Sequence, residues 1–425
     1  MRFQLAGTIA ALAGLVAADR TCGANWETRY TATAAQEVAA AAATAKTSSP
    51  TSHVPGKAFD RLVIIYFENQ NYDKSIGDEL TCQVNFNYFA KKGILLDNYF
   101  ALTHPSQPNY MAAIAGDYFG MQNDNFIRAP RNISTVIDLL EYRGISWGHY
   151  QEDMPYSGFE GMGFKNQNNG KNDYVRKHNP AIMHDSIVHW ESRLSQIKNL
   201  SMIDTSRSVF HQDLAADKLP QWMFITPNMT SDGHDTDVTT AGAWCRTFLD
   251  PLLEDKKFMK KTLVLVTFDE NETYPNRNQI LGVLLGDAVP KELVGTTDNN
   301  FYNHYSEIAT VSANWDLPTL GRWDVGANVY QMVAAKTGDK LRKWSSPEQL
   351  QSMYFNYSQA GQFSTAGGNK RFPAPNLKLD HAVNGRKILP RIKEIWANSQ
   401  APTYYEDTVE VPDGLHPPKG YEPSK

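Results

Sequence analysis

Two pairs of oxygen-bearing side chains, each directly after a short apolar run, are the part of this sequence best suited to chemistry. One run, Thr262–Phe268, leads into the pair Asp269-Glu270, and the other, Leu62–Phe67, leads into Glu68-Asn69. Short apolar runs of this kind are typical of buried strands. In open α/β sheets, ligands bind beyond the carboxyl ends of the strands. If both strands lie in one sheet, we expect the four side chains to converge on one hard cation.

Each pair taken separately also fits a simpler interpretation. Strands have to end, and Asp, Glu and Asn are common in the polar turns that follow them. The prediction of a cation site therefore depends on whether the chain also offers a nucleophile and basic residues that could act at the same site.

Ser106 is a possible nucleophile. Two prolines bracket Ser106-Gln107, and Tyr110–Gly116 has the composition of a helix that stops at a glycine. This pattern places Ser106 at or just before a helix amino terminus. A serine there is commonly an N-cap. The alternative is a nucleophile, because a phosphate attacked at this point would lie among free backbone N–H groups at the positive end of the helix.

Basic residues at three further points fit an anionic substrate. Lys177 and His178 are adjacent, and His304 precedes a helical stretch at Glu307–Asn314. His234 belongs to the loop 226–237, which also carries Asp232, Asp235 and Asp237. That loop is either a solvated turn or a segment that brings His234 to the same site.

The first residues of the chain have the features of a targeting segment. Met1–Ala18 combines one arginine, a short apolar stretch and small residues placed for cleavage, which is typical of a secretory signal peptide. No later run reaches the ~20 apolar residues of a membrane helix, and the polar carboxyl terminus has no lipid-anchor signal. The formal net charge of −5 and the lack of long basic runs argue against a nucleic-acid partner. We expect a protein released to the extracellular space, the cell wall or a vacuole.

Asparagines and cysteines fit that compartment. Five Asn-x-Ser/Thr sites occur, and Asn271 adjoins the proposed site closely enough to be shielded; the remaining glycosylation candidates are Asn132, Asn199, Asn228 and Asn356. Three cysteines suggest one disulfide and one free thiol in an oxidising compartment. We favour Cys82–Cys245, because Cys22 lies in an arm expected to be mobile.

The order of the predicted elements indicates an α/β fold. Further strands are expected at Trp222–Ile225 and Gln279–Leu285, and further helices at Gln36–Lys46, Thr135–Tyr142, His189–Leu200 and Ala241–Leu253. Short apolar strands that alternate with helices predict a central, mainly parallel sheet flanked by helices. We expect a signal peptide at 1–18, an Ala/Thr/Ser-rich arm and linker at 19–57, a catalytic domain at 58–336 and a packed extension at 337–425.

At these residues the sequence resembles a known family. The matching segments occur in the family's order: Glu68–Asp73 (ENQNYD), His104–Tyr110 (HPSQPNY), Lys177–Pro180 (KHNP), Asp232–Asp235 (DGHD), Thr267–Glu272 (TFDENE), Asn303–Ser306 (NHYS) and Asn314–Arg322 (NWDLPTLGR). The chain is similar to the secreted phosphoesterases that include fungal phosphate-repressible acid phosphatases and bacterial phospholipases C, within the alkaline-phosphatase-like superfamily. The likeness is closest to the fungal acid phosphatases.

The resemblance implies a set of roles. It places one metal ion among Glu68, Asn69, Asp269 and Glu270, with Ser106 both contacting the metal and attacking phosphorus. It implies that His178 and His234 bind phosphate or handle protons, and that Asn109 and His304 bind substrate. Lys177 stands where some members have a histidine, so its role stays open. Oxygen ligands of this kind suit Ca²⁺, Mg²⁺ or Mn²⁺ better than structural zinc.

Together these features predict a secreted acid phosphatase. It would hydrolyse small phosphate monoesters through a phosphoserine intermediate on Ser106. Two alternatives remain: a phospholipase C that cleaves phosphodiester head groups, and a non-catalytic secreted protein that binds phosphate esters. A sulfatase is disfavoured, because Ser106 is followed by Pro108 but then by Tyr110 where the sulfatase pattern has arginine.

Overall fold

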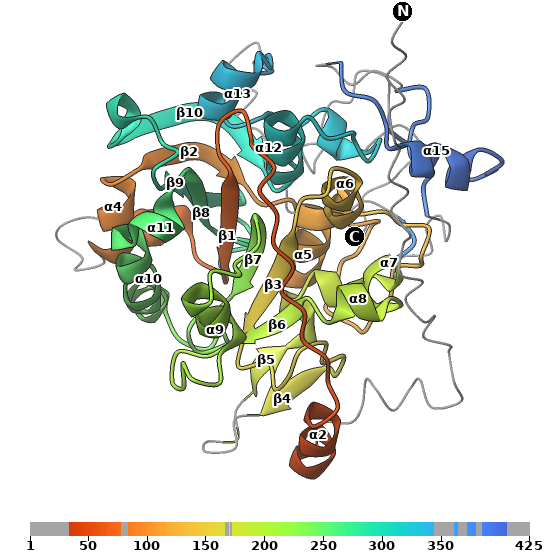
Figure 1. Ribbon diagram of the computed structural model, residues 1–425. Coiled ribbons are helices and arrows are strands. Elements are labelled where there is room, and N and C mark those ends of the chain that lie inside the picture. Colours follow the sequence, from red (N-terminus) through yellow and green to blue (C-terminus); the bar gives the residue numbers. More distant parts are fainter. Residues whose placement is uncertain are drawn as a thin grey trace, which may run out of the picture.

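A computed structural model describes residues 34–77, 84–165, 170, 172–343, 361–363, 372–379 and 385–405. An eight-stranded sheet runs through the molecule, with α4, α10 and α11 on one side of it and α5, α6 and α12 on the other (Figure 1). The expected signal peptide and the start of the arm lie outside the described residues. No helix within the described ranges is long and apolar enough to cross a bilayer.

The sheet confirms the predicted mainly parallel α/β architecture. Its strands lie in the order β10 (Thr296–Asn303), β2 (Ile94–Phe100), β9 (Gln279–Leu285), β8 (Thr262–Phe268), β1 (Arg61–Phe67), β7 (Trp222–Thr226), β3 (Trp147–Glu152) and β6 (Ile197–Leu200). β9 runs antiparallel to β2 and β8, and the other neighbours are parallel. A separate hairpin pairs β4 (Gly163–Lys165) with β5 (Asn172–Val175).

The helices cover both faces of this sheet. The helices of the described residues, whether or not they lie on the sheet, are α2 (Ala35–Ala42), α3 (Tyr72–Ile76), α4 (Val84–Ala90), α5 (Ser106–Ala115), α6 (Val136–Tyr142), α7 (Asp185–Val188), α8 (Glu191–Leu194), α9 (Val209–Ala215), α10 (Val238–Glu254), α11 (Lys256–Met259), α12 (Tyr305–Trp315), α13 (Gln331–Thr337) and α15 (Pro390–Trp396). Gly116 ends α5 in the left-handed region at φ 72°, which glycine adopts without steric cost.

Strand β1 shows why the apolar runs are continuous. Its residues from Leu62 to Phe67 are all buried. Phe67 packs against Phe86 of α4 and Trp244 of α10, whereas Tyr66 packs against Tyr110 of α5 on the opposite face. Because both faces of the sheet are covered, the strand has no solvent side that would require alternating polar residues.

One predicted helix is wrong in its second half. The stretch expected to be helical over 189–200 ends as helix at Leu194, and Ile197–Leu200 form the edge strand β6. Ile197 pairs with His149 and Leu200 with Glu152 of β3. Pairing with the neighbouring strand therefore overrides the local helical pattern.

Both flanking segments contact the domain where they are described. In the predicted linker, Ser49 donates to Asp213 at 2.8 Å and Ser52 donates to Gln221 at 2.6 Å. Near the carboxyl end, Tyr405 donates to Asp117 at 2.5 Å and packs against Trp323. Side-chain hydrogen bonds thus hold both segments against the folded unit.

The structure gives no support to the expected disulfide. Cys245 is a buried free thiol on α10, and Cys82 lies outside the described residues. A thiol inside the apolar face of a helix packs as a small hydrophobic side chain.

The predicted glycosylation sites differ in their accessibility. Asn228 is buried, and its amide is occupied: the oxygen accepts from the backbone of Thr230 and Ser231, and the nitrogen donates to Asp153. A sugar at this nitrogen would break that turn, so the structure argues against Asn228. The amide of Asn199 also bonds the backbone, Asn132 is half-buried, and Asn356 lies outside the described residues. Asn271 is buried, as expected.

Glu152, the last residue of β3, fastens the loop that follows β7. Its buried carboxylate accepts from the backbone N–H of Asn228 and from the indole of Trp244, both at 2.9 Å. Burial, followed by the charge of Asp153, raises the pKa of Glu152 from 4.5 to about 7. The loop held in this way leads to Asp232 and His234.

This raised pKa predicts a pH-dependent stability. The pKa of Glu152 is higher in the folded than in the unfolded state. Below pH 4.5 its ionisation therefore does not lower the free energy of unfolding, and between pH 4.5 and about 7 this free energy falls as the pH rises. At about 1.4 kcal/mol per pH unit, the loss is about 3 kcal/mol. Urea unfolding from pH 4.5 to 8 should show that the difference in unfolding free energy between wild type and Glu152→Gln changes by this amount.

The exposed Glu254 provides the matched control. Glu254→Gln removes a carboxylate from the surface and should leave the pH dependence of unfolding as in wild type. Parallel curves for wild type and Glu152→Gln would contradict the assigned pKa.

Candidate active site

Strands β1 and β8 are neighbours and end at the same edge of the sheet. Their register pairs Phe67 with Phe268, so Glu68 and Asp269 leave the two strands side by side. The expectation that both apolar runs lie in one sheet is therefore confirmed. Asp269 continues the parallel pattern, since its N–H donates to the carbonyl of Phe67 at 3.0 Å.

Ser106 lies where the two strand ends meet. Its Oγ is 2.9 Å from Glu68 Oε2, 3.3 Å from Glu270 Oε1 and 3.5 Å from Asn69 Oδ1. Ser106 is the first residue of α5, whose N-cap is Pro105, so its hydroxyl does not cap the helix. One hydroxyl hydrogen cannot satisfy three acceptors, and oxygens crowded in this way are typical of ligands around a cation.

The polar pairs are held by tight local geometry. Asn69 has φ 47°, a left-handed conformation that asparagine tolerates better than most residues. One carboxylate oxygen of Asp269 accepts from the backbone N–H of Asn69 at 3.1 Å and of Glu270 at 2.7 Å. Its other oxygen, Oδ2, is buried and has no hydrogen-bond partner. That oxygen is available to a ligand.

His178 and Asp232 lie on the other side of Glu68. His178 Nε2 is 3.2 Å from Glu68 Oε1, and its Nδ1 is 3.5 Å from Asp232 Oδ2. Tyr110 stacks on the His178 ring and donates to Glu68 Oε1 at 2.5 Å. One ligand atom each from Glu68, His178 and Asp232 lies within 4.8 Å of the others, so this buried cluster could hold a metal ion.

The buried carboxyl groups of the site would be stabilised by a positive charge beside them. Burial raises the pKa of four carboxyl groups, and repulsion from neighbouring carboxylates adds to the effect for at least three of them; the four are Glu68, Asp232, Asp269 and Glu270. Burial, together with Lys177 and His234, holds the pKa of His178 well below its usual value. This shift favours the neutral imidazole, whose lone pair a metal ligand must offer.

Lys177 and His234 form a partly exposed pair beside the carboxylates. Lys177 Nζ donates to Asp124 at 3.0 Å and lies 3.4 Å from His234 Nε2. Because an ammonium group can only donate, His234 Nε2 accepts and its Nδ1–H donates to Asp235 at 2.9 Å. Burial opposes the charge of Lys177, but Glu68 and Asp124 outweigh it and raise the pKa of Lys177.

Two predicted substrate-binding residues are occupied by protein groups. Asn109 accepts from the backbone N–H of Leu102 at 2.9 Å and donates to the carbonyl of Thr103 at 2.8 Å, so it shapes the turn before Ser106. His304 is fully buried, with Nε2 at 2.7 Å from the Asp269 carbonyl and Nδ1 at 2.7 Å from the Tyr66 hydroxyl. The expectation that His304 faces the substrate has no support in this geometry.

Sequence reasoning assigned no role to several residues that the structure places here. They are His104, Tyr110, Asp124, Asp232 and Tyr274. His104 Nε2 lies 2.8 Å from Asn271 Oδ1, its ring centroid lies 3.9 Å from that of Tyr274, and burial lowers its pKa to about 4. His104, Tyr110 and Asp232 belong to the segments that carry the resemblance, which was an available signal. No pattern pointed to Asp124 or Tyr274.

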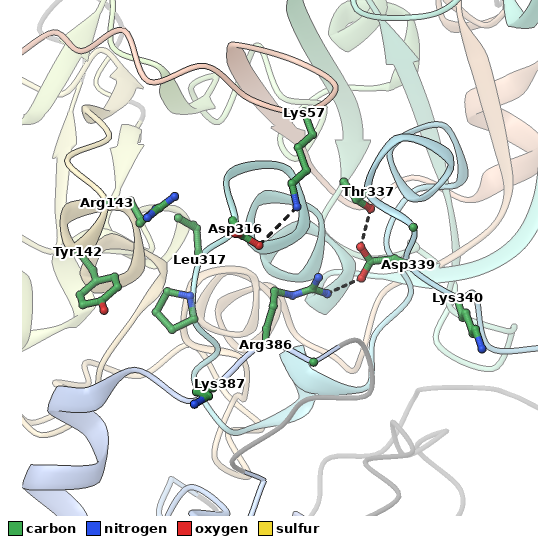
Figure 2. Close-up of a pocket in the computed structure, with 13 residues that line it drawn as sticks. Lys57, Tyr142, Arg143, Asp316, Leu317, Thr337, Asp339, Lys340, Arg386 and Lys387 are labelled. Carbon is green, nitrogen blue, oxygen red and sulfur yellow. Dashed lines mark hydrogen bonds and ion pairs between the residues drawn. The ribbon is translucent and has the colours of Figure 1, made fainter.

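A cavity of about 550 Å³ elsewhere in the molecule has a structural explanation (Figure 2). Its cationic lining comprises Lys57, Arg143, Lys340, Arg386 and Lys387. Helices α6, α12 and α13 end at residues beside it, and cations stabilise helix carboxyl termini. Lys57 also pairs with Asp316 at 3.4 Å and Arg386 with Asp339 at 2.6 Å. Neither Ser106 nor the four side chains Glu68, Asn69, Asp269 and Glu270 line this cavity.

Comparisons with known proteins identify the family of this chain. The Phosphoesterase family profile matches residues 81–318. A probable acid phosphatase from Kluyveromyces lactis is 46% identical over 377 residues, covering 88% of this chain and 85% of its own. An acid phosphatase from Aspergillus fumigatus is 47% identical over 369 residues, covering 86% and 79%.

Similar solved structures include an alkaline phosphatase superfamily protein from Vibrio parahaemolyticus. It has a TM-score of 0.39 and 12% identity, covering 65% of this chain and 73% of its own. The family match spans more than half of the chain, and the fungal relatives cover most of it. The chain therefore belongs to the phosphoesterase family.

Proposed function

We propose that this phosphoesterase is an acid phosphatase that hydrolyses phosphate monoesters with Ser106 as nucleophile. The observation that carries the proposal is the position of Ser106 Oγ, within 3.5 Å of oxygens from Glu68, Asn69 and Glu270. The names of the fungal relatives support the same activity.

A divalent metal ion fits the residues around Ser106. We assign its ligands to Glu68, Asn69, Ser106, Asp269 and Glu270, because the unpartnered Asp269 Oδ2 and the crowded oxygens need a positive partner. Carboxylate, amide and hydroxyl donors suit Ca²⁺, Mg²⁺ or Mn²⁺. When bound, the ion would offset the buried negative charge and favour the ionised form of the serine hydroxyl. Glu68 also belongs to the cluster with His178 and Asp232, which we place next to this ion.

We assign the steps of phosphate monoester hydrolysis to residues of the chain. Ser106 Oγ attacks phosphorus, the bond to the leaving alcohol breaks, and water later cleaves the phosphoserine. The hydrogen bond to Glu68 at 2.9 Å orients the hydroxyl. We assign phosphate binding to Lys177, which is partly exposed, and proton donation to the imidazolium form of His234, which carries a hydrogen on Nε2 when Lys177 turns to the phosphate. The lowered pKa of His178 disfavours it as the proton donor, so we assign it to the buried cluster with Glu68 and Asp232.

We also propose that the protein is secreted. The support is Met1–Ala18, whose composition is that of a signal peptide. The natural substrates would then be small soluble phosphate monoesters outside the cell.

Ser106→Ala tests the nucleophile. Without the hydroxyl no phosphoserine forms, so kcat on p-nitrophenyl phosphate should fall by about 10³-fold or more. Ser312→Ala is the matched control, because Ser312 is a buried helical serine that donates to the Pro318 carbonyl. Substantial activity in Ser106→Ala would rule out the serine mechanism.

Asp269→Asn and Asp232→Asn test the place of the metal. If the ion lies by Ser106, Asp269→Asn should weaken Mn²⁺ binding by about 100-fold or more, whereas Asp232→Asn should weaken it by about tenfold. Metal analysis after dialysis and thermal shift on titration with Mn²⁺ both measure this. The reverse ranking would move the ion to the His178–Asp232 side of Glu68.

A comparison of esters tests the substrate class. Ser106 is 1% exposed, and a diester would have to bring a second large group on phosphorus to this buried hydroxyl. We expect kcat/KM for p-nitrophenyl phosphate to exceed that for p-nitrophenyl phosphorylcholine by at least about 100-fold. Preference for the diester would favour the phospholipase C interpretation, and turnover of neither would favour a binding protein.

A further inference from the structure

The peptide group between Asp269 and Glu270 joins two of the assigned metal ligands. Its N–H, which belongs to Glu270, donates to Asp269 Oδ1 at 2.7 Å. Its C=O accepts from His304 Nε2 at 2.7 Å. Strand β8 ends one residue earlier, at Phe268, so His304 supplies a hydrogen bond at the point where the regular strand has ended. The orientation of this peptide sets the directions in which both carboxylates leave the strand.

His304 is itself held by a buried polar cluster. Its Nδ1 lies 2.7 Å from the Tyr66 hydroxyl, whose oxygen also contacts Glu307. Tyr99 donates to Glu307 at 2.9 Å. All four side chains are at most 2% exposed. Because a carbonyl can only accept, the bond to Asp269 places a hydrogen on Nε2 and leaves Nδ1 facing Tyr66.

We propose that His304 is a positioning residue that sets the Asp269–Glu270 peptide, with Tyr66 and Glu307 holding the imidazole in place. This inference rests on the proposed metal site and deepens it. His304 acts through the protein backbone and does not touch the substrate. Its position at the start of α12 links that helix to the end of β8.

The composition of the cluster favours a role beyond packing. A carboxylate, an imidazole and two phenols are removed from water in the core between α5, α12 and the sheet. Burying such groups costs free energy that apolar side chains of the same volume would not incur. Side chains hydrogen-bonded behind metal ligands orient those ligands, and their loss typically costs about 10- to 100-fold in metal affinity or activity.

The test compares His304→Ala with His304→Gln. The glutamine amide can donate to the Asp269 carbonyl, whereas alanine cannot. Mn²⁺ titration followed by thermal shift should show about 10- to 100-fold weaker binding in His304→Ala and recovery to within about fivefold of wild type in His304→Gln. Phosphatase kcat should follow the same order, with KM changed by less than about threefold.

Tyr66→Phe provides a second variant, because it removes only the hydroxyl that holds the imidazole. It should weaken Mn²⁺ binding by about three- to tenfold while the circular dichroism spectrum stays as in wild type. Ser312→Ala, at a buried serine further along the same helix that donates to the Pro318 carbonyl, is the matched control and should leave Mn²⁺ binding unchanged.

The outcomes separate this inference from the proposed function. An inactive wild-type protein that binds no Mn²⁺ would overturn the function itself. Wild-type Mn²⁺ affinity in both folded His304→Ala and Tyr66→Phe would overturn only the positioning role. A raised KM with unchanged Mn²⁺ affinity, not rescued by glutamine, would also overturn it and make His304 a substrate contact.

Discussion

The parallel pairing of β1 with β8 is the interaction on which the site depends. It brings Glu68 beside Asp269, which is separated from it by about two hundred residues of chain. The backbone hydrogen bonds of the pair continue one residue past the strands, from Asp269 N–H to the Phe67 carbonyl. The carboxylates are therefore fixed by the sheet and not by a mobile loop, which suits a site that must hold ligand atoms at set distances.

Burying this much acid in the core has a cost that other parts of the fold offset. Tyr110 donates to Glu68, and Lys177 lies near enough to lower the pKa of both Glu68 and Glu270. These contacts reduce the repulsion without removing it, since the pKa of both carboxyl groups stays raised. A bound cation would offset the remaining repulsion between the carboxylates, because buried charges persist in proteins when they are paired or ligate metals.

The two faces of the sheet contribute differently to the site. On one side, Phe67 packs among Phe86 and Trp244 and supplies an apolar support. On the other side, Tyr66 reaches His304, and α5 presents Ser106. The alternation of side chains along β1 thus separates the packing function of the strand from its polar function.

The sequence by itself determined the local features of the site. The apolar runs of β1, β7, β8 and β9, the polar pairs that follow β1 and β8, and a serine at a helix start all follow from side-chain type and spacing. The predicted α5 began later than the observed helix, which starts at Ser106 itself.

Tertiary structure alone decided which of these features meet. It made 197–200 an edge strand, turned His304 toward Tyr66, and brought Asp124 to Lys177. Such contacts join residues far apart in the chain, and their energy comes from burial and strand pairing that exist only once the whole sheet has formed.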